Sequence, residues 1–236
     1  MAGTFFAGLD FAMREAALFA ACGFLVLGIS DLAVDLIWIA RAFWRGLIGR
    51  RSGNVDPLPP SRKPGRLAVF IPAWDEAGVI AKMLHYSLAI WGEGDYRLYI
   101  GCYPNDAATI EAVRSIDDPR VRLVIGTAPG PTTKADCLNR LWQALLGDER
   151  AEAWRAKAIV LHDAEDVVHS AELQVFDPLI EKFDLVQLPV LPLIDRRSLW
   201  VGCHYIDEFL EAHGKELVVR EALGTSIPSA GVGCAF

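Results

Sequence analysis

The sequence predicts an α/β fold, in which a doubly wound, mainly parallel sheet follows one N-terminal transmembrane helix. Beyond residue 65, short apolar segments alternate with segments of helical spacing. This alternation is typical of βαβ units, whose right-handed crossovers bury a parallel sheet between two layers of helices. An apolar run, residues 16–40, comes earlier, and a segment rich in Pro, Gly and Arg separates the two regions. We therefore predict an N-terminal segment with a transmembrane helix (1–48), a linker (49–65) and one domain (66–236).

The expected strands are short and almost wholly apolar, and the expected helices fill the intervals between them. Strands are expected at residues 66–72, 96–104, 121–126, 157–163 and 185–193. Helices are expected at residues 77–91, 107–116, 133–146 and 171–183.

Composition and charge exclude some classes of protein. The formal net charge of the 236 residues is −7, which argues against a nucleic-acid partner, because binding to phosphates requires a basic face. The five cysteines are scattered and form no CxxC pair. A disulfide framework or a zinc site is therefore not expected, and a reducing compartment fits better.

The apolar run at residues 16–40 is long enough to cross a hydrocarbon layer of about 30 Å. A signal peptide would carry its positive charge before such a run. Here Arg41 and Arg45 follow it, which predicts that the C-terminal side is cytoplasmic. Asp31 and Asp35 share one helix face. Either they lie near the cytoplasmic interface or they face partner helices in a longer protein, because carboxylates at membrane depth are costly.

Polar residues follow three of the expected strands. They occupy residues 72–76, 104–106 and 162–166. Ligands of doubly wound sheets bind at the carboxyl ends of the strands, so these segments are the candidate site. An acidic rim of this kind suits an anionic nucleotide only when a cation intervenes.

Asp163 and Glu165 are the candidate metal ligands, because they stand two apart where the chain turns after a strand. Mg²⁺ or Mn²⁺ takes hard oxygen ligands, often one or two carboxylates together with substrate phosphates. The alternative is a solvated acidic start of a helix, where carboxylates are favoured by the helix dipole.

Four segments together resemble one known family. They are "FIPAWDEAGVI", "TKADCLNR", "LHDAED" and "SAGVGCAF". Their order and separations are similar to the P-x-x-N-E, K-x-x-x-L-N, D-A-D-D and G-x-G-x-x-F motifs of family 2 glycosyltransferases, which have the GT-A fold. The wording looks closest to the bacteriophage adsorption protein B branch of membrane glycosyltransferases. The resemblance covers residues 66–236, and its motifs are weak singly but strong together.

The resemblance implies roles for the matching residues. The nucleotide-binding residues would be Pro72, Ala73, Glu76, Asp106, Lys134 and Asp163. Asp163 and Glu165 would hold Mg²⁺ or Mn²⁺, and Gly231 and Gly233 would lie on the acceptor side. In this family the general base follows the glycine-rich segment, so no catalytic residue is assigned and the base is expected beyond Phe236. Asp75 and Glu165 depart from the family pattern, which has Asn and Asp at these positions.

The expected function is metal-dependent, inverting transfer of a sugar from a nucleoside diphosphate sugar, UDP-linked, to a glycan or lipid-linked acceptor. The reaction would take place at the cytoplasmic face of a bacterial inner membrane, and a partner protein in the membrane or outer envelope is expected as well. Two alternatives stay open. One is a sugar nucleotidyltransferase, although the Gly- and Arg-rich loop of that class is missing after the first strand. The other is a non-catalytic membrane scaffold or nucleotide-binding module.

Single residues also have simpler interpretations. Glu76 could cap the helix that follows it, and Asn105 and Asp106 are good turn formers. Lys134 could be a solvated helix residue. His162 directly precedes Asp163, so the two point to opposite faces of a strand. We therefore expect His162 to be a hydrogen-bonded or core histidine and not a metal ligand.

Overall fold

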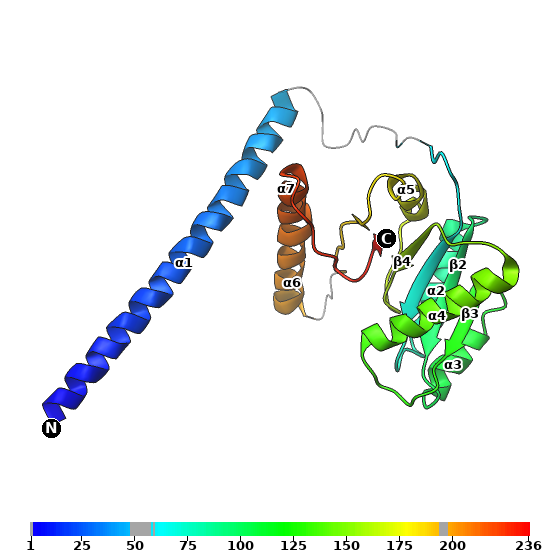
Figure 1. Ribbon diagram of the computed structural model, residues 1–236, viewed down its shortest axis with the longest axis horizontal. Coiled ribbons are helices and arrows are strands. Elements are labelled where there is room, and N and C mark those ends of the chain that lie inside the picture. Colours follow the sequence, from blue (N-terminus) through cyan, green and yellow to red (C-terminus); the bar gives the residue numbers. More distant parts are fainter. Residues whose placement is uncertain (1, 48–57, 59, 194–197) are drawn as a thin grey trace. The chain divides into compact units, whose positions relative to one another are not determined.

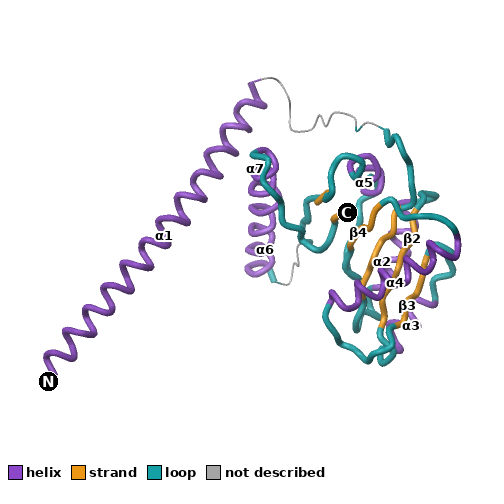
Figure 2. The backbone as a smooth tube through the Cα atoms, in the orientation of Figure 1, coloured by secondary structure: helices purple, strands orange, loops and turns teal. Residues whose placement is uncertain are grey.

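The computed structural model describes residues 2–47, 58, 60–193 and 198–236. The chain forms two compact units (Figures 1 and 2). The sheet unit contains Asp56–Val190 and Ser229–Phe236, and the helical unit contains Met1–Val55 and Leu191–Pro228. Residues 48–57 and 59, which form most of the predicted linker, lie outside the described residues. The predicted domain boundaries therefore stay predictions.

The sheet unit is built on a mainly parallel sheet of six strands among the described residues. The strands are β1 (Leu67–Pro72), β2 (Tyr96–Cys102), β3 (Val121–Ile125), β4 (Ala158–Leu161), β5 (Val186–Gln187) and β6 (Cys234–Ala235). Their order is β3-β2-β1-β4-β6-β5. The first four are mutually parallel, and β6 pairs antiparallel with both β4 and β5. The predicted fold class is confirmed.

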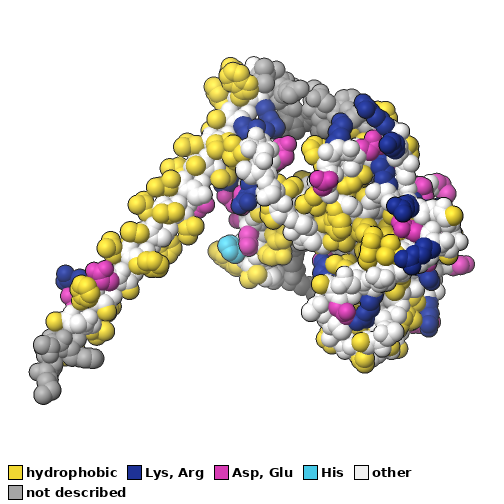
Figure 3. Space-filling model, viewed as in Figure 1, with side chains coloured by type: hydrophobic (Ala, Val, Ile, Leu, Met, Phe, Trp, Pro, Cys, Tyr) yellow, Lys and Arg dark blue, Asp and Glu magenta, His cyan; other side chains and the backbone are white. Residues whose placement is uncertain are grey.

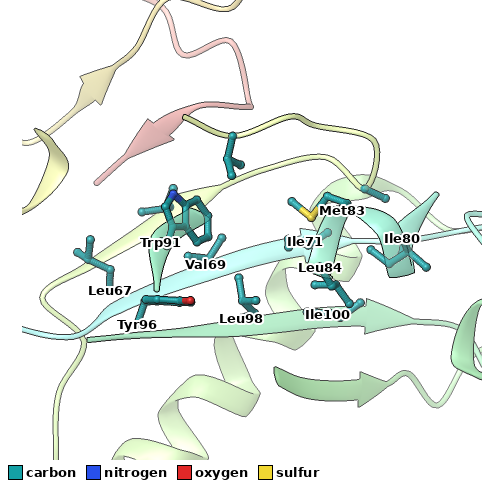
Figure 4. Close-up of a cluster of buried hydrophobic side chains, with 14 of the residues drawn as sticks. Leu67, Val69, Ile71, Ile80, Met83, Leu84, Trp91, Tyr96, Leu98 and Ile100 are labelled. Atoms are coloured by element: carbon teal, nitrogen blue, oxygen red, sulfur yellow. The ribbon is translucent and has the colours of Figure 1, made fainter. Parts of the chain in front are cut away.

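Helices cover both faces of this sheet. They are α2 (Ile80–Trp91), α3 (Ala107–Arg114), α4 (Lys134–Glu152) and α5 (Glu172–Leu179). Alternate residues of β1 enter two cores, because successive side chains of a strand point to opposite faces. Leu67, Val69 and Ile71 pack with α2, α3 and α5, while Ala68 and Phe70 pack against α4. Figure 4 shows the first core, in which side chains of α2 lie over β1 and β2.

Close contact between α4 and the sheet depends on Gly101 of β2. A Cβ atom at this position would collide with Sγ of Cys137, which is buried on α4. The absence of a side chain lets the helix approach the strand, so α4 begins close to the carboxyl ends of the central strands.

The prediction of one strand over residues 185–193 is wrong in extent, because β5 consists of Val186–Gln187 alone. Pro189 and Pro192 lie in the remainder of this segment, and proline has no N–H to donate to a sheet. The pairing of these residues with β6 (Cys234–Ala235), a strand too short for any sequence pattern, was not predicted.

The helical unit contains α1 (Ala2–Leu47), α6 (Leu199–Glu211), a π-helical turn η1 (Ala212–Glu216) and α7 (Leu217–Ala222). Among the described residues, α1 is the one helix long and apolar enough to cross a membrane. Figure 3 shows apolar side chains along its visible face, and Phe24 is 77% exposed. By length and composition, α1 matches the predicted transmembrane helix.

Asp35 of α1 has a partner within this chain. The Nζ atom of Lys215 in η1 forms an ion pair with the Asp35 carboxylate, and the indole N–H of Trp38 donates to the carbonyl oxygen of Gly214 at 3.3 Å. This contact lies within the chain, so both interpretations of the Asp31 and Asp35 carboxylates stay predictions. Asp31 is exposed.

Candidate functional site

The loop after β1 holds the first group of predicted site residues. Pro72 ends β1, and the buried Ala73 continues the ladder by donating its N–H to the carbonyl oxygen of Gly101 at 2.8 Å. Asp75 has a φ of 59°. Among non-glycine residues, Asn and Asp adopt this left-handed conformation most readily. Aspartate therefore replaces the asparagine of the family pattern without loss of the backbone shape.

Asp106 fastens this loop to the neighbouring one. One carboxylate oxygen accepts the N–H of Asp75 at 2.7 Å, and the other accepts the N–H of Thr109 at 3.2 Å as the N-cap of α3. Burial alone would raise the pKa of Asp106, but these hydrogen bonds outweigh it and hold the pKa below its usual range. Thr109 also accepts the N–H of Glu76 through its hydroxyl at 3.0 Å. The predicted contact of Asp106 with the base stays a prediction, and the observed contacts give it a role in shaping the loop.

Lys134 connects two other predicted segments. It is the first residue of α4, whose N-cap Thr133 accepts the N–H of Asp136 through its side chain at 3.2 Å. Nζ of Lys134 lies 2.5 Å from a carboxylate oxygen of Asp163 and 3.2 Å from the carbonyl oxygen of Gly231. The lysine thus joins the acidic turn to the glycine-rich loop.

The acidic turn follows β4, which pairs in parallel with β1, the strand before Glu76. Asp163 is half-buried and Glu165 is exposed. Burial and the neighbouring carboxylates of Glu165, Asp75 and Asp163 raise the pKa of Glu76. The sheet therefore gathers the predicted carboxylates from two strand ends at one edge, where negative charge is in excess.

This donor set fits Mg²⁺ or Mn²⁺ only when a ligand completes the coordination. Within the described residues, no three side chains of the His, Cys, Asp or Glu type form a metal cage by themselves. Asp163 and Glu165 offer hard oxygen atoms, and Mg²⁺ is commonly bound by one or two carboxylates plus substrate phosphates. The crowding that raises the pKa of Glu76 would be relieved by a cation.

The glycine-rich loop is shaped by backbone conformation. Gly231 and Gly233 have φ values of 79° and 59°, which side-chain-bearing residues rarely adopt. Gln187 of β5 holds this loop, because its side chain donates to the carbonyl oxygen of Val232 at 2.9 Å and accepts the N–H of Ala230 at 2.8 Å. Sequence reasoning missed Gln187, and the available signal was one amide side chain within an apolar segment.

A second group that sequence reasoning missed lies beneath the acidic turn. His162 is 3% exposed. Its Nδ1 lies 2.9 Å from an Asp166 carboxylate oxygen, and its Nε2 lies 2.8 Å from one of Glu172. Burial alone would lower the pKa of His162, but the two carboxylates outweigh it and raise the pKa to about 9. The expectation of a hydrogen-bonded histidine is met, while its two partners could not be named from spacing.

A groove of about 740 Å³ lies away from these strand ends, on the α4 face of the sheet. Trp142, Ile159 and Phe236 are among the residues that line it. Because it contains none of the clustered carboxylates, we place the candidate site at the strand ends and not in this groove.

The chain belongs to the glycosyltransferase-like family 2, whose family model matches residues 64–236. This family is named for the transfer of a glycosyl group.

Two curated relatives match almost the whole chain. Bacteriophage adsorption protein B of Escherichia coli (strain K12) is 37% identical over 240 residues, which cover 98% of this chain and 32% of the relative. Bacteriophage N4 adsorption protein B of Escherichia coli O157:H7 gives the same identity and coverage. The chain thus spans about a third of the length of these relatives, and it is similar to the branch that its motifs indicated.

Solved glycosyltransferase structures resemble the chain more remotely. TarS of S. aureus has a TM-score of 0.41 at 13% identity, with 56% of this chain and 37% of the other covered. The mannosyltransferase PcManGT from Pyrobaculum calidifontis, solved with GDP-Man and Mn²⁺, has a TM-score of 0.40 at 16% identity, with 83% and 57% covered.

Proposed function

We propose that this glycosyltransferase moves a sugar from a UDP-linked donor to a glycan or lipid-linked acceptor, with inversion and with a divalent cation. The observation that carries the proposal is the meeting of Asp163, Glu165 and Glu76 at the carboxyl edge of a parallel sheet, beside Lys134. Glycosyl transfer from a nucleoside diphosphate releases a diphosphate, and negative charge grows on it as the bond breaks.

Each residue has a distinct task in this proposal. Asp163 and Glu165 would hold Mg²⁺ or Mn²⁺, and the bound cation would supply positive charge for the departing diphosphate. Lys134 lies beside Asp163 and can reach the same phosphates. Pro72, Ala73 and Glu76 border the nucleoside, where the loop shape set by Asp106 keeps the backbone in place. Gly231 and Gly233 leave room on the acceptor side, and no residue of the chain is assigned as the general base.

Calorimetry with the full chain in detergent tests the metal site. Wild-type protein should bind UDP in the presence of Mn²⁺ and lose this affinity when Mn²⁺ is chelated. Asp163→Ala and Glu165→Ala should each lower the affinity by more than about tenfold, because outer-shell changes alone typically cost that much. Asp117→Ala is the matched control, since this exposed carboxylate precedes β3 at the opposite edge of the sheet. Unchanged affinity in both site variants would refute the metal assignment.

A product assay tests the reaction class. A glycosyltransferase releases UDP from a UDP-sugar, whereas a nucleotidyltransferase consumes a nucleoside triphosphate and releases pyrophosphate. Nucleotide binding without either product from the full-length relatives would favour the scaffold function.

The membrane location is part of the proposal. Within α1, Arg41 and Arg45 follow the apolar run at residues 16–40, which favours a cytoplasmic sheet unit at a bacterial inner membrane. A fluorescent-protein fusion after Phe236 should be fluorescent, and an alkaline phosphatase fusion at the same position should be inactive. The opposite pair of results would reverse the orientation. Crosslinking in intact cells would test the expected partner protein in the membrane or outer envelope.

A further inference from the structure

His162 occupies an unusual place directly beneath the proposed metal ligands. Both of its ring nitrogens face carboxylates, Asp166 at 2.9 Å and Glu172 at 2.8 Å. His162 and Glu172 are each 3% exposed. A carboxylate only accepts hydrogen bonds, so the ring donates through both nitrogens and pairs a cation with two anions inside the protein. Such a group is costly to bury unless its geometry is fully satisfied.

The contacts continue from the ring to the acidic turn. The Asp166 oxygen that accepts from His162 also accepts the backbone N–H of Asp163 at 3.0 Å. In return, the backbone N–H of Asp166 donates to the carbonyl oxygen of Asp163 at 3.2 Å. The ring therefore fixes the side chain of Asp166, and Asp166 fixes the peptide plane of Asp163. Glu172, in the first turn of α5, anchors the far side of the ring.

We infer that His162 is a positioning residue of the donor site. It holds the Asp163–Asp166 turn, which contains Asp163 and Glu165, without touching cation or nucleotide itself. The inference rests on the proposed function, because it assigns His162 to the geometry of that same site. Carboxylates that bind a cation are ordinarily held by outer hydrogen bonds of this kind, and their loss weakens metal binding.

A purely structural role for His162 is the competing explanation, and the other end of β4 supplies its control. Lys157, just before β4, binds Asp177 at 2.5 Å and Glu181 at 2.9 Å. This second cluster also connects β4 to α5 and the residues after it, but it lies at the edge of the sheet away from the candidate site. Removing it should destabilise the protein without altering the acidic turn.

The test compares His162→Gln with Lys157→Met in the full chain in detergent. Mn²⁺-dependent UDP affinity is measured by calorimetry below the melting temperature of each variant. We expect His162→Gln to lose about tenfold to a hundredfold in affinity, and Lys157→Met to stay within about twofold of wild type. The inference is overturned if His162→Gln melts at a lower temperature yet binds as wild type, or if Lys157→Met loses as much affinity.

Hydrogen exchange separates this inference from the proposed function. Deuterium uptake over residues 162–167 should be about tenfold faster in His162→Gln, because the bond from the Asp163 N–H to Asp166 is released. If wild-type protein does not bind UDP, the proposed function fails, and the exchange rate still decides whether His162 holds the turn. Unchanged exchange in the variant overturns the inference.

Asp166→Ala provides a second route if His162→Gln does not fold. It removes the middle link and leaves the contact between His162 and Glu172 in place, and the Asp166 side chain is 26% exposed. Its affinity should fall with faster exchange over the same segment. Wild-type affinity in Asp166→Ala overturns the inference as well.

Discussion

Each end of β4 has one basic side chain between two carboxylates, and one of these carboxylates belongs to α5. The two clusters differ in the burial of the ion pair with α5. At the start of the strand, the side chains of Lys157, Asp177 and Glu181 are 12%, 23% and 18% exposed. At its end, His162 and Glu172 are each 3% exposed, while the Asp166 side chain is 26% exposed. We call these the lysine cluster and the histidine cluster.

The difference teaches what each cluster contributes. The lysine cluster also binds two residues of the predicted linker. Glu181 accepts hydrogen bonds from the Ser61 hydroxyl at 2.7 Å and from the Lys63 N–H at 2.9 Å. Water reaches it, so each of its contacts is replaceable. His162 and Glu172 are closed to water, so solvent cannot replace the bond between them, and the histidine cluster lies beside the candidate site. Similar chemistry thus fastens the chain at one end of β4 and orients side chains at the other.

The largest expected difference is between two carboxylates on α5. Glu172→Ala leaves the buried His162 with one carboxylate, and we expect the free energy of unfolding to fall by about 3 kcal/mol. Asp177→Ala, on the same helix, should cost about 1 kcal/mol, because its cluster is partly exposed. Urea unfolding of the full chain in detergent, followed by near-UV circular dichroism, measures both. Equal losses would show that burial does not distinguish the clusters.

The pH dependence of stability should differ as well. His162 has a pKa of about 9 in the folded protein against an ordinary value of 6.5. A pKa raised by folding gives stability that is complete below the unfolded pKa and is lost as pH rises through the folded one. We therefore expect the free energy of unfolding to fall by roughly 3 kcal/mol between pH 6.5 and pH 9.

The control for this pH effect is His162→Gln, which should remove most of the slope. The lysine cluster should add none in this range, because burial alone would lower the pKa of Lys157 but its two carboxylates raise it above 10.5. A slope unchanged by His162→Gln would assign the effect to another group.

Lys134 is a third basic side chain near β4, and its contribution is expected in ligand affinity and not in stability. The Lys134 side chain is 43% exposed and lies against Asp163. Lys134→Met should lower Mn²⁺-dependent UDP affinity by about tenfold, as expected for the loss of one charge-assisted hydrogen bond. The affinity for Mn²⁺ alone should rise, because the competing cation on Asp163 is gone. Calorimetry measures both, and parallel losses would contradict the assigned contact.

The smallest expected effect is that of salt. In 1 M NaCl the penalty of Lys157→Met should shrink by a few tenths of a kcal/mol, roughly, because exposed charges are screened. The penalty of Glu172→Ala should not change, since water and ions do not reach the ring of His162. The same urea titrations at low and high salt measure the change in each penalty. Equal salt effects would indicate that solvent reaches both clusters.

Much of the sheet unit could be predicted because its signals are local. The apolar strand at Leu67–Pro72 and the helix at Ile80–Trp91 each show in a single window of sequence. The edge where Asp163 meets Glu76 followed from the rule that parallel strands end together. The side-chain partners could not be predicted. Glu172 reaches His162 only because α5 packs beside β4, and Gln187 holds Ala230 only because β5 and β6 pair.

The left-handed backbone at Asp75 also shows why motifs are only partly informative. In the sequence motif alone, the asparagine of the family pattern suggests a chemical requirement for an amide side chain. In the structure the Asp75 backbone N–H binds Asp106, and its φ of 59° selects the residue type. In this chain, aspartate at position 75 therefore suits the left-handed backbone as asparagine would.

The ion pair between Asp35 and Lys215 has a consequence for the biosynthesis of the chain. The two residues are 180 positions apart, and a ribosome delivers the N-terminal one first. An anchoring α1 would therefore enter the bilayer while Asp35 has no partner, with Arg41 and Arg45 as the nearby charges that restrain its depth. Lys215 is made later, so the ion pair with Asp35 forms only after most of the sheet unit has been synthesised.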